Sequence, residues 1–186
     1  AGTIAPNERS GECKPCAPGT YQNETAATEC RPCEDGSFCP FGASAPLPCR
    51  EGSFSSATNL ASADECTKTD PGFFAPTGSR EPTPCAAGTF ARSGGLATCE
   101  LCPAGTFASA LGNTACSNCT RGFLCVEGAT TPQPCPGGTY ADPVILATVG
   151  YLSNITTDCL ECPAGTSCPL GSAEPVPCLP GSFSIN

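Results

Sequence analysis

The stretch CTKTDPGFFAPTGSREPTPC, from Cys66 to Cys85, decides how the cysteines of this chain are paired. It has no internal cysteine, although the chain holds 18 cysteines in 186 residues. Cysteine at this density is typical of a secreted scaffold held together by disulfides. The gap therefore needs an explanation in terms of the pattern around it.

The surrounding pattern is a repeat of the form Cys-x-x-Gly-[Ser/Thr]-[Phe/Tyr]. Copies begin at Cys16, Cys33, Cys49, Cys85, Cys102, Cys135 and Cys178, and looser copies at Cys119 and Cys162. The opening stretch hides a further copy, TDPGFF, which begins at Thr69. The glycine suits a tight turn with positive φ, and we expect the aromatic ring to pack over an adjacent disulfide.

Two kinds of unit alternate along the chain. Long units run between cysteines such as Cys16 and Cys30, and short units have the form C-x5-C-x2-G-x3-P-x-P-C. The stretch from Thr69 to Cys85 keeps the spacing of a short unit, but Thr69 and Ala75 replace its first two cysteines. The loss of one cysteine alone would leave its partner unpaired. Their joint loss predicts that these two positions pair with each other elsewhere.

The joint loss predicts a disulfide inside each of the three intact short units, and the long units then pair within themselves, which gives eight disulfides. They are Cys16–Cys30, Cys33–Cys39, Cys49–Cys66, Cys85–Cys99, Cys102–Cys116, Cys119–Cys125, Cys135–Cys159 and Cys162–Cys168. Cys13 and Cys178 are left over, and we expect their partners outside this fragment of a longer array. Crossed or nested pairing between neighbouring units stays open, because spacing does not fix connectivity.

The predicted fold class is a set of small disulfide-rich repeats in an elongated array. We expect short two-stranded β-ribbons and little or no helix, since each repeat is too short for a conventional core. The expected repeats cover residues 16–48, 49–84, 102–134 and 135–177, with a single long unit at 85–101. Residues 1–15 would end a preceding repeat and residues 178–186 would begin the next.

Several other functions are disfavoured by composition. The net charge is −9 with only eight basic residues, which argues against nucleic acid as a partner. The chain has no histidine, so we expect no His-dependent catalysis, no catalytic residues and no cofactor. Pairs of C-x-x-C could hold zinc, and Asp64, Glu65 and Asp70 could touch calcium, but disulfides explain the cysteines better. The chain has no apolar run of 18 residues, so we expect no membrane insertion within this fragment.

The segments CPAGTFASALGNTACSNC and CAPGTYQNETAATECRPC resemble the GCC2/GCC3 or ephrin-receptor-like cysteine-rich repeat, which is similar in style to the modules of tumour-necrosis-factor receptors. The resemblance covers nearly the whole chain. It implies an extracellular, disulfide-bonded array of the kind found in cell-surface receptors and in protist and algal surface coats, including flagellar mastigonemes. It carries over no catalytic residue. The chain departs from the repeat at Thr69, at Ala75 and in the long Cys135–Cys159 loop.

Two features point to interactions. N-x-[Ser/Thr] sequons predict N-linked glycans at Asn23, Asn118 and Asn154. The Cys135–Cys159 loop is the longest and carries Val144, Ile145, Leu146 and Val149, which form either a local mini-core or an exposed contact for another protein chain.

From the sequence we therefore expect a structural, non-catalytic stretch of an extracellular coat or filament, such as a mastigoneme. The expected partners are copies of the chain itself or another coat protein. The alternative is a ligand-binding receptor ectodomain.

Overall fold

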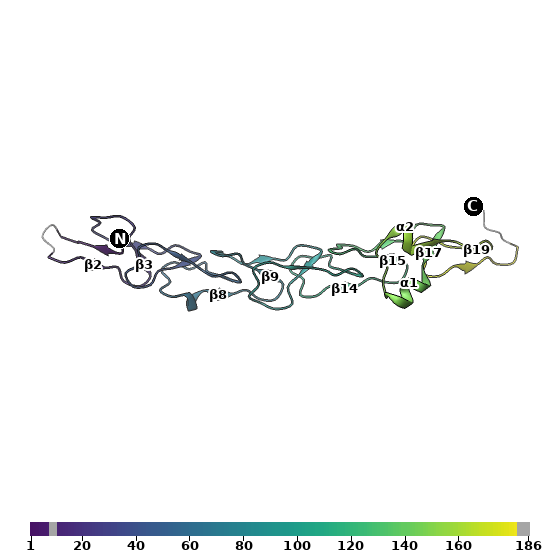
Figure 1. Ribbon diagram of the computed structural model, residues 1–186, viewed down its shortest axis with the longest axis horizontal. Helices are drawn as coiled ribbons and strands as arrows, with labels where there is room; N and C mark the ends of the chain where they lie inside the picture. The colour runs from purple at the N-terminus through teal and green to yellow at the C-terminus, as the bar shows by residue number, and fades with distance from the viewer. Residues whose placement is uncertain (8–10, 182–186) are drawn as a thin grey trace. The chain divides into compact units, whose positions relative to one another are not determined.

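The computed structural model describes residues 1–7 and 11–181 of the chain. Over these residues the backbone forms ten two-stranded antiparallel sheets, and each sheet is a hairpin of strands two or three residues long (Figure 1). The prediction of small disulfide-rich repeats with short ribbons and little helix is confirmed. The prediction that the repeats form an elongated array stays a prediction.

The hairpins follow one another along the chain. Their strand pairs are β1 (Thr3–Ile4) with β2 (Lys14–Pro15), β3 (Thr20–Tyr21) with β4 (Arg31–Pro32), β5 (Ser37–Phe38) with β6 (Leu47–Pro48), β7 (Ser53–Phe54) with β8 (Thr67–Lys68), β9 (Phe73–Phe74) with β10 (Thr83–Pro84), β11 (Thr89–Phe90) with β12 (Glu100–Leu101), β13 (Thr106–Phe107) with β14 (Ser117–Asn118), β15 (Phe123–Leu124) with β16 (Gln133–Pro134), β17 (Thr139–Ala141) with β18 (Cys159–Glu161), and β19 (Thr166–Ser167) with β20 (Val176–Pro177). The helical segments are the 3-10 turn η1 (Ala63–Glu65) and the helices α1 (Pro143–Thr148) and α2 (Ile155–Asp158).

The chain divides into two compact units. The first unit is Ala1–Cys85 with Ala91–Cys99, and the second is Ala86–Phe90 with the described residues from Glu100 onward. The hairpins from β1–β2 to β9–β10 belong to the first unit, and those from β11–β12 to β19–β20 belong to the second. The repeat boundaries expected from the sequence are finer than this division and stay a prediction.

Each hairpin begins with a turn that the repeat motif specifies. In the turn before β3, Gly19 has φ of 83°, a conformation that strongly favours glycine. The hydroxyl of Thr20 donates a hydrogen bond to the carbonyl oxygen of Ala17 at 2.7 Å. The same bond closes the turns before β7, β11, β13, β17 and β19, where Ser53, Thr89, Thr106, Thr139 and Thr166 donate. This bond explains why Ser or Thr follows the glycine.

The turn glycine also joins its hairpin to the next one through both of its backbone polar groups. The Gly19 N–H donates to the Cys39 carbonyl at 2.8 Å, and the Gly19 carbonyl accepts from the Cys33 N–H at 2.9 Å. The same pair of bonds is made by Gly2, Gly36, Gly52 and Gly72 in the first unit and by Gly88, Gly105 and Gly138 in the second. Since these bonds use only the backbone, the repeats stack without requiring particular side chains.

Small buried clusters take the place of a conventional core. In the first unit Tyr21 packs with Cys33, Cys39 and Ala43, so the ring of one hairpin covers the disulfide of the next. In the second unit Phe90 packs in the same way with Cys102 and its partner Cys116. The expected role of the aromatic position is therefore visible in both units.

Candidate functional site

The described residues contain eight disulfides, and these join the same pairs of cysteines that were predicted from the sequence. The Cα atoms of the long-unit pair Cys16–Cys30 are 5.8 Å apart, and those of the short-unit pair Cys33–Cys39 are 5.9 Å apart. Both distances are ordinary for a disulfide. The first cysteine of every long unit is fully buried, so the bridges form the interior of the hairpin stack.

The short unit from Thr69 to Cys85 lacks a disulfide, and a hydrogen bond to Thr69 lies where the disulfide would be. Thr69 and Ala75 are both buried, with 3% and 0% of their surfaces exposed. The Gly95 N–H donates to the hydroxyl of Thr69 at 2.9 Å and also to its carbonyl at 3.1 Å. Phe73 and Phe74 follow Thr69 in the same unit. The two rings are half-buried, and sequence analysis missed the hydroxyl bond because 26 residues separate its partners.

The first hairpin is a copy of the repeat that the sequence analysis did not include. Gly2 has φ of 78° and makes both of the bonds typical of the turn glycines. Ile4 follows it at the position that is usually aromatic, which is why the motif search passed over it. Cys13 lies directly before β2, as Cys30 lies directly before β4. Cys13 and Cys178 have no disulfide partner among the described residues, and pairing outside the fragment stays a prediction.

The three sequon asparagines all have exposed side chains. Asn118 ends β14 and is paired with Thr106. Asn154 is the N-cap of α2, where its Oδ1 accepts hydrogen bonds from the N–H and the hydroxyl of Thr156 at 3.0 and 2.7 Å. An N-linked sugar would replace a hydrogen on Nδ2 and leave that acceptor in place. Glycosylation at these positions stays a prediction.

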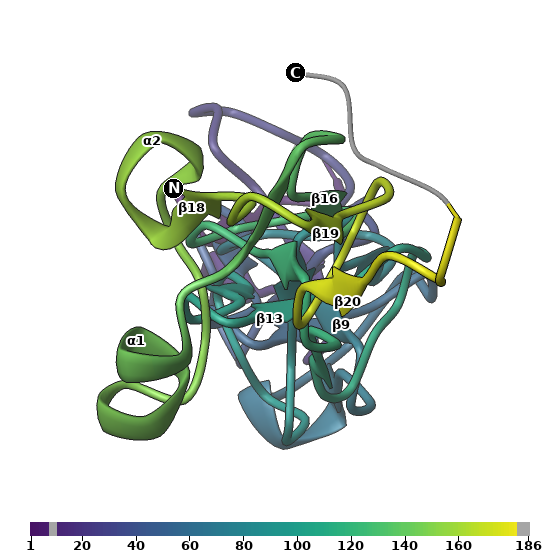
Figure 2. The same ribbon diagram turned by 90° about the vertical axis from the view of Figure 1, so that its right-hand side faces the viewer.

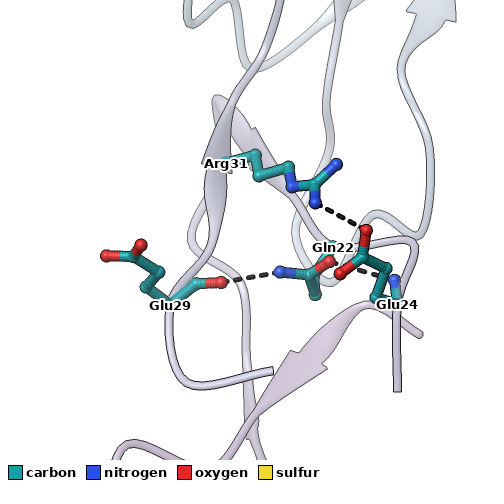
Figure 3. A network of polar contacts seen from close by, with 4 residues as sticks. All are labelled: Gln22, Glu24, Glu29 and Arg31. Carbon is teal, nitrogen blue, oxygen red and sulfur yellow. Dashed lines mark hydrogen bonds and ion pairs between the residues drawn. The ribbon is translucent and has the colours of Figure 1, made fainter. Parts of the chain in front are cut away.

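The loop that carries Asn23 is organised by its neighbours (Figure 3). The buried Gln22 side chain donates from Nε2 to the Glu29 carbonyl at 2.7 Å and accepts at Oε1 from the Glu24 N–H at 3.0 Å. The Arg31 guanidinium donates to the Glu24 carboxylate at 2.6 Å. This hydrogen bond and the charge attraction raise the pKa of Arg31. The sequon is therefore held on both sides by a polar network.

The enlarged Cys135–Cys159 loop contains both α-helices of the described chain, and Figure 2 shows them on the side of the second unit away from β19 and β20. Ile145 and Leu146 pack against a buried cluster that includes Leu152. Val144 and Val149 point outward, with 66% and 53% of their surfaces exposed. The four residues suggested as a contact thus divide into two that build a mini-core and two that face solvent.

Asp158 holds the second half of this loop. Its carboxylate is buried and accepts hydrogen bonds from the backbone N–H groups of Ser153 and Asn154 at 2.7 and 2.9 Å and from the Thr157 hydroxyl at 2.6 Å. Burial alone would raise the pKa of Asp158, but these hydrogen bonds outweigh it and hold the pKa below its usual value of 3.8. Sequence analysis did not single out this residue.

The acidic residues considered for calcium do not converge. Asp64 and Glu65 lie in η1, and the Glu65 carboxylate accepts weakly from the Ala61 N–H and the Ser62 hydroxyl at 3.4 Å. Over the described ranges, no group of three or more His, Cys, Asp or Glu side chains is placed to hold a metal ion. In the same part of the chain, no helix combines the length and the apolar character needed to cross a membrane.

Comparison with known families gives a match over part of the chain. A family model described as tyrosine-protein kinase ephrin type A/B receptor-like matches residues 88–134, from the turn before β11 to the end of β16. Residues 88–134 are thus similar to an ephrin-receptor-like cysteine-rich repeat. A search of curated proteins finds no significant match to the chain. The repeat and its disulfides fit an extracellular location, while the more specific GCC2/GCC3 assignment stays a prediction.

Proposed function

We propose that this chain is a structural, non-catalytic stretch of a long extracellular cysteine-rich array in a surface coat or filament, such as a flagellar mastigoneme. The observation that supports this proposal most is the backbone connection between hairpins. In both compact units, turn glycines such as Gly19 and Gly105 bond through the N–H and through the carbonyl to residues farther along the chain. A stack joined in this way can be extended by adding repeats, since each repeat contacts mainly its neighbours.

The enlarged loop supplies a place where such an array could contact other chains. Val144 in α1 and Val149 at its C-cap are exposed, while Ile145 and Leu146 anchor the helix to the buried cluster. An apolar pair carried on an anchored helix can bury surface against a partner at little entropic cost, because the helix is already ordered. We take copies of the chain itself as the expected partners.

A receptor ectodomain is the second candidate, and the family match at residues 88–134 supports it. The two candidates differ in where the full-length protein is found. Immunogold labelling with antibodies against this chain should decorate extracellular filaments or a coat at regular intervals. Label confined to the plasma membrane would contradict the structural proposal and favour the receptor.

Self-association of the secreted chain provides a second test. We expect Val144→Asp with Val149→Asp to weaken assembly, as measured by analytical ultracentrifugation. The matched control is Leu101→Asp with Leu111→Asp, which changes two leucines of the second unit that are 56% and 70% exposed. Equal assembly of both variants and the parent chain would show that α1 is not the contact. Changing Ile145 or Leu146 would be less informative, because it would also disrupt the mini-core.

A further inference from the structure

A polar depression lies inside the loop that follows β3. Its volume is about 390 Å³, and Gln22 lies among its lining residues. Glu24, Thr28, Glu29 and Arg31 also line it, and Glu29 turns its backbone carbonyl toward Gln22. Ala27 and Pro32 add apolar surface to the same depression. Charged and hydroxyl groups that converge beside a small apolar patch are a common arrangement in ligand sites.

Gln22 is unusual for its place in the hairpin. In each long unit, the residue directly after the aromatic position is buried, and elsewhere it is small: Ser55, Ala91, Ala108 and Ala141. Only in the loop that carries the Asn23 sequon does a long polar side chain fill this position. Its amide fixes Glu24 and Glu29 through the bonds at 3.0 and 2.7 Å (Figure 3). The larger residue therefore shapes the depression.

The chemistry of the lining narrows the class of ligand. The Glu24 carboxylate disfavours an anion, and the Arg31 guanidinium disfavours a cation. Carboxylates accept hydrogen bonds, a guanidinium donates them, and the Thr28 hydroxyl does both. A neutral ligand with several hydroxyls and an amide would match this set, while its C–H groups could contact Ala27 and Pro32. A saccharide built from N-acetylglucosamine has these properties.

We propose that this depression is a saccharide-binding site that takes the N-acetylglucosamine core of an N-linked glycan. The inference deepens the proposed extracellular function and rests on it. Asn23 lies between two residues that line the depression, and its side chain is exposed. The sugar can come from Asn23 of the same chain or from a glycan on a neighbouring chain. In either case Gln22 acts as a positioning residue.

The test uses the secreted chain with its disulfides intact. Removal of the Asn23 glycan by Asn23→Gln should empty the depression, and added N,N′-diacetylchitobiose should then shift the backbone NMR signals of residues 22–32. Arg31→Ala and Gln22→Ala, each added to Asn23→Gln, should weaken this binding about tenfold, the loss expected for one or two hydrogen bonds. Gln22→Ala should fold, because alanine occupies the same position in three other hairpins. Ser55→Ala, made in the Asn23→Gln chain, is the matched control and should bind the sugar as tightly as Asn23→Gln alone.

The source of the sugar follows from comparison of the glycosylated parent with Asn23→Gln. Weaker response of the parent to added sugar identifies the chain's own glycan as the occupant, and equal response identifies a glycan from elsewhere. No shift of residues 22–32 in Asn23→Gln at millimolar chitobiose would overturn the proposal. Binding that is unchanged when Gln22→Ala or Arg31→Ala is added to Asn23→Gln would overturn it as well. These outcomes leave the labelling of filaments unaffected, so the two proposals fail separately.

Discussion

Restoring the missing disulfide by Thr69→Cys with Ala75→Cys tests how the repeat is built. The Thr69 N–H donates to the Gly52 carbonyl, as the Cys33 N–H donates to the Gly19 carbonyl. The Ala75 N–H donates to the Leu96 carbonyl, as the Cys39 N–H donates to Leu60. The backbone at the two positions is therefore held as in an intact short unit. We expect the new bridge to form during oxidative folding.

The expected gain follows from two opposing effects. A bridge that closes a loop of about seven residues constrains the unfolded chain by about 2 kcal/mol at 25 °C. The Thr69 hydroxyl bond to the Gly95 N–H is lost, at a cost of about 1 kcal/mol. The Gly95 N–H keeps its bond to the carbonyl at position 69, so no buried donor is left unpaired. The net stabilisation should be about 1 kcal/mol, equivalent to about fivefold slower amide exchange.

Native-state hydrogen exchange is the appropriate assay, because an array of repeats need not unfold in one step. The amides of β9 and β10 should exchange about fivefold more slowly in the oxidised variant, and reduction should reverse the effect. The reciprocal variant, Cys33→Thr with Cys39→Ala, should be about 1 kcal/mol more stable than the double alanine variant, because Asn59 can donate as Gly95 does. A bridge that forms without slowing exchange in β9 and β10 would refute the reasoning.

Three further changes have definite expected outcomes. Ala26→Gly should stabilise the first unit by about 1 kcal/mol in denaturant unfolding, since Ala26 has φ of 56° and glycine tolerates that conformation without strain; an unchanged midpoint would contradict this. Gly88→Ala should destabilise the second unit by about 2 kcal/mol or more, toward the upper end of the usual effects of single substitutions, because a Cβ there would collide with the Gly128 carbonyl. A stability equal to that of the parent would be inconsistent with the turn geometry. The contribution of Asp158 to the free energy of unfolding is fully present above its usual pKa of 3.8 and is lost as the pH falls through the lower pKa of the folded chain. Protection of the α2 amides from exchange should therefore drop on acidification. Asp158→Asn should show little of this pH dependence.

Much of the hairpin architecture could be predicted because the repeat specifies it locally. The glycine that needs positive φ, the hydroxyl that closes the turn and the cysteine spacing all lie within a few residues of one another. The joint replacement by Thr69 and Ala75 added the information that spacing alone lacks, because it showed which two positions depend on each other.

Other features depended on residues distant in the sequence or on weak local signals. The Gly95 bond to Thr69 and the neighbour-to-neighbour bonds of the turn glycines arise only when the repeats stack. Helix α1 has six residues, too few for helix propensity to decide its formation. A signal for it was present, since Asp142 and Pro143 are favourable at the N-cap and first helical positions. The role of Gln22 had no signal except its departure from the small residues at the same position elsewhere.

Non-reducing peptide mapping of the secreted chain tests the central claim most directly. After digestion with several proteases, mass spectrometry should recover Cys33 linked to Cys39 and Cys16 linked to Cys30, with the same within-unit pattern along the chain. Recovery of Cys16 linked to Cys33, or of Cys33 linked to Cys49, would contradict the within-unit scheme. Free thiols throughout, with zinc bound to the purified protein, would contradict the extracellular assignment as well.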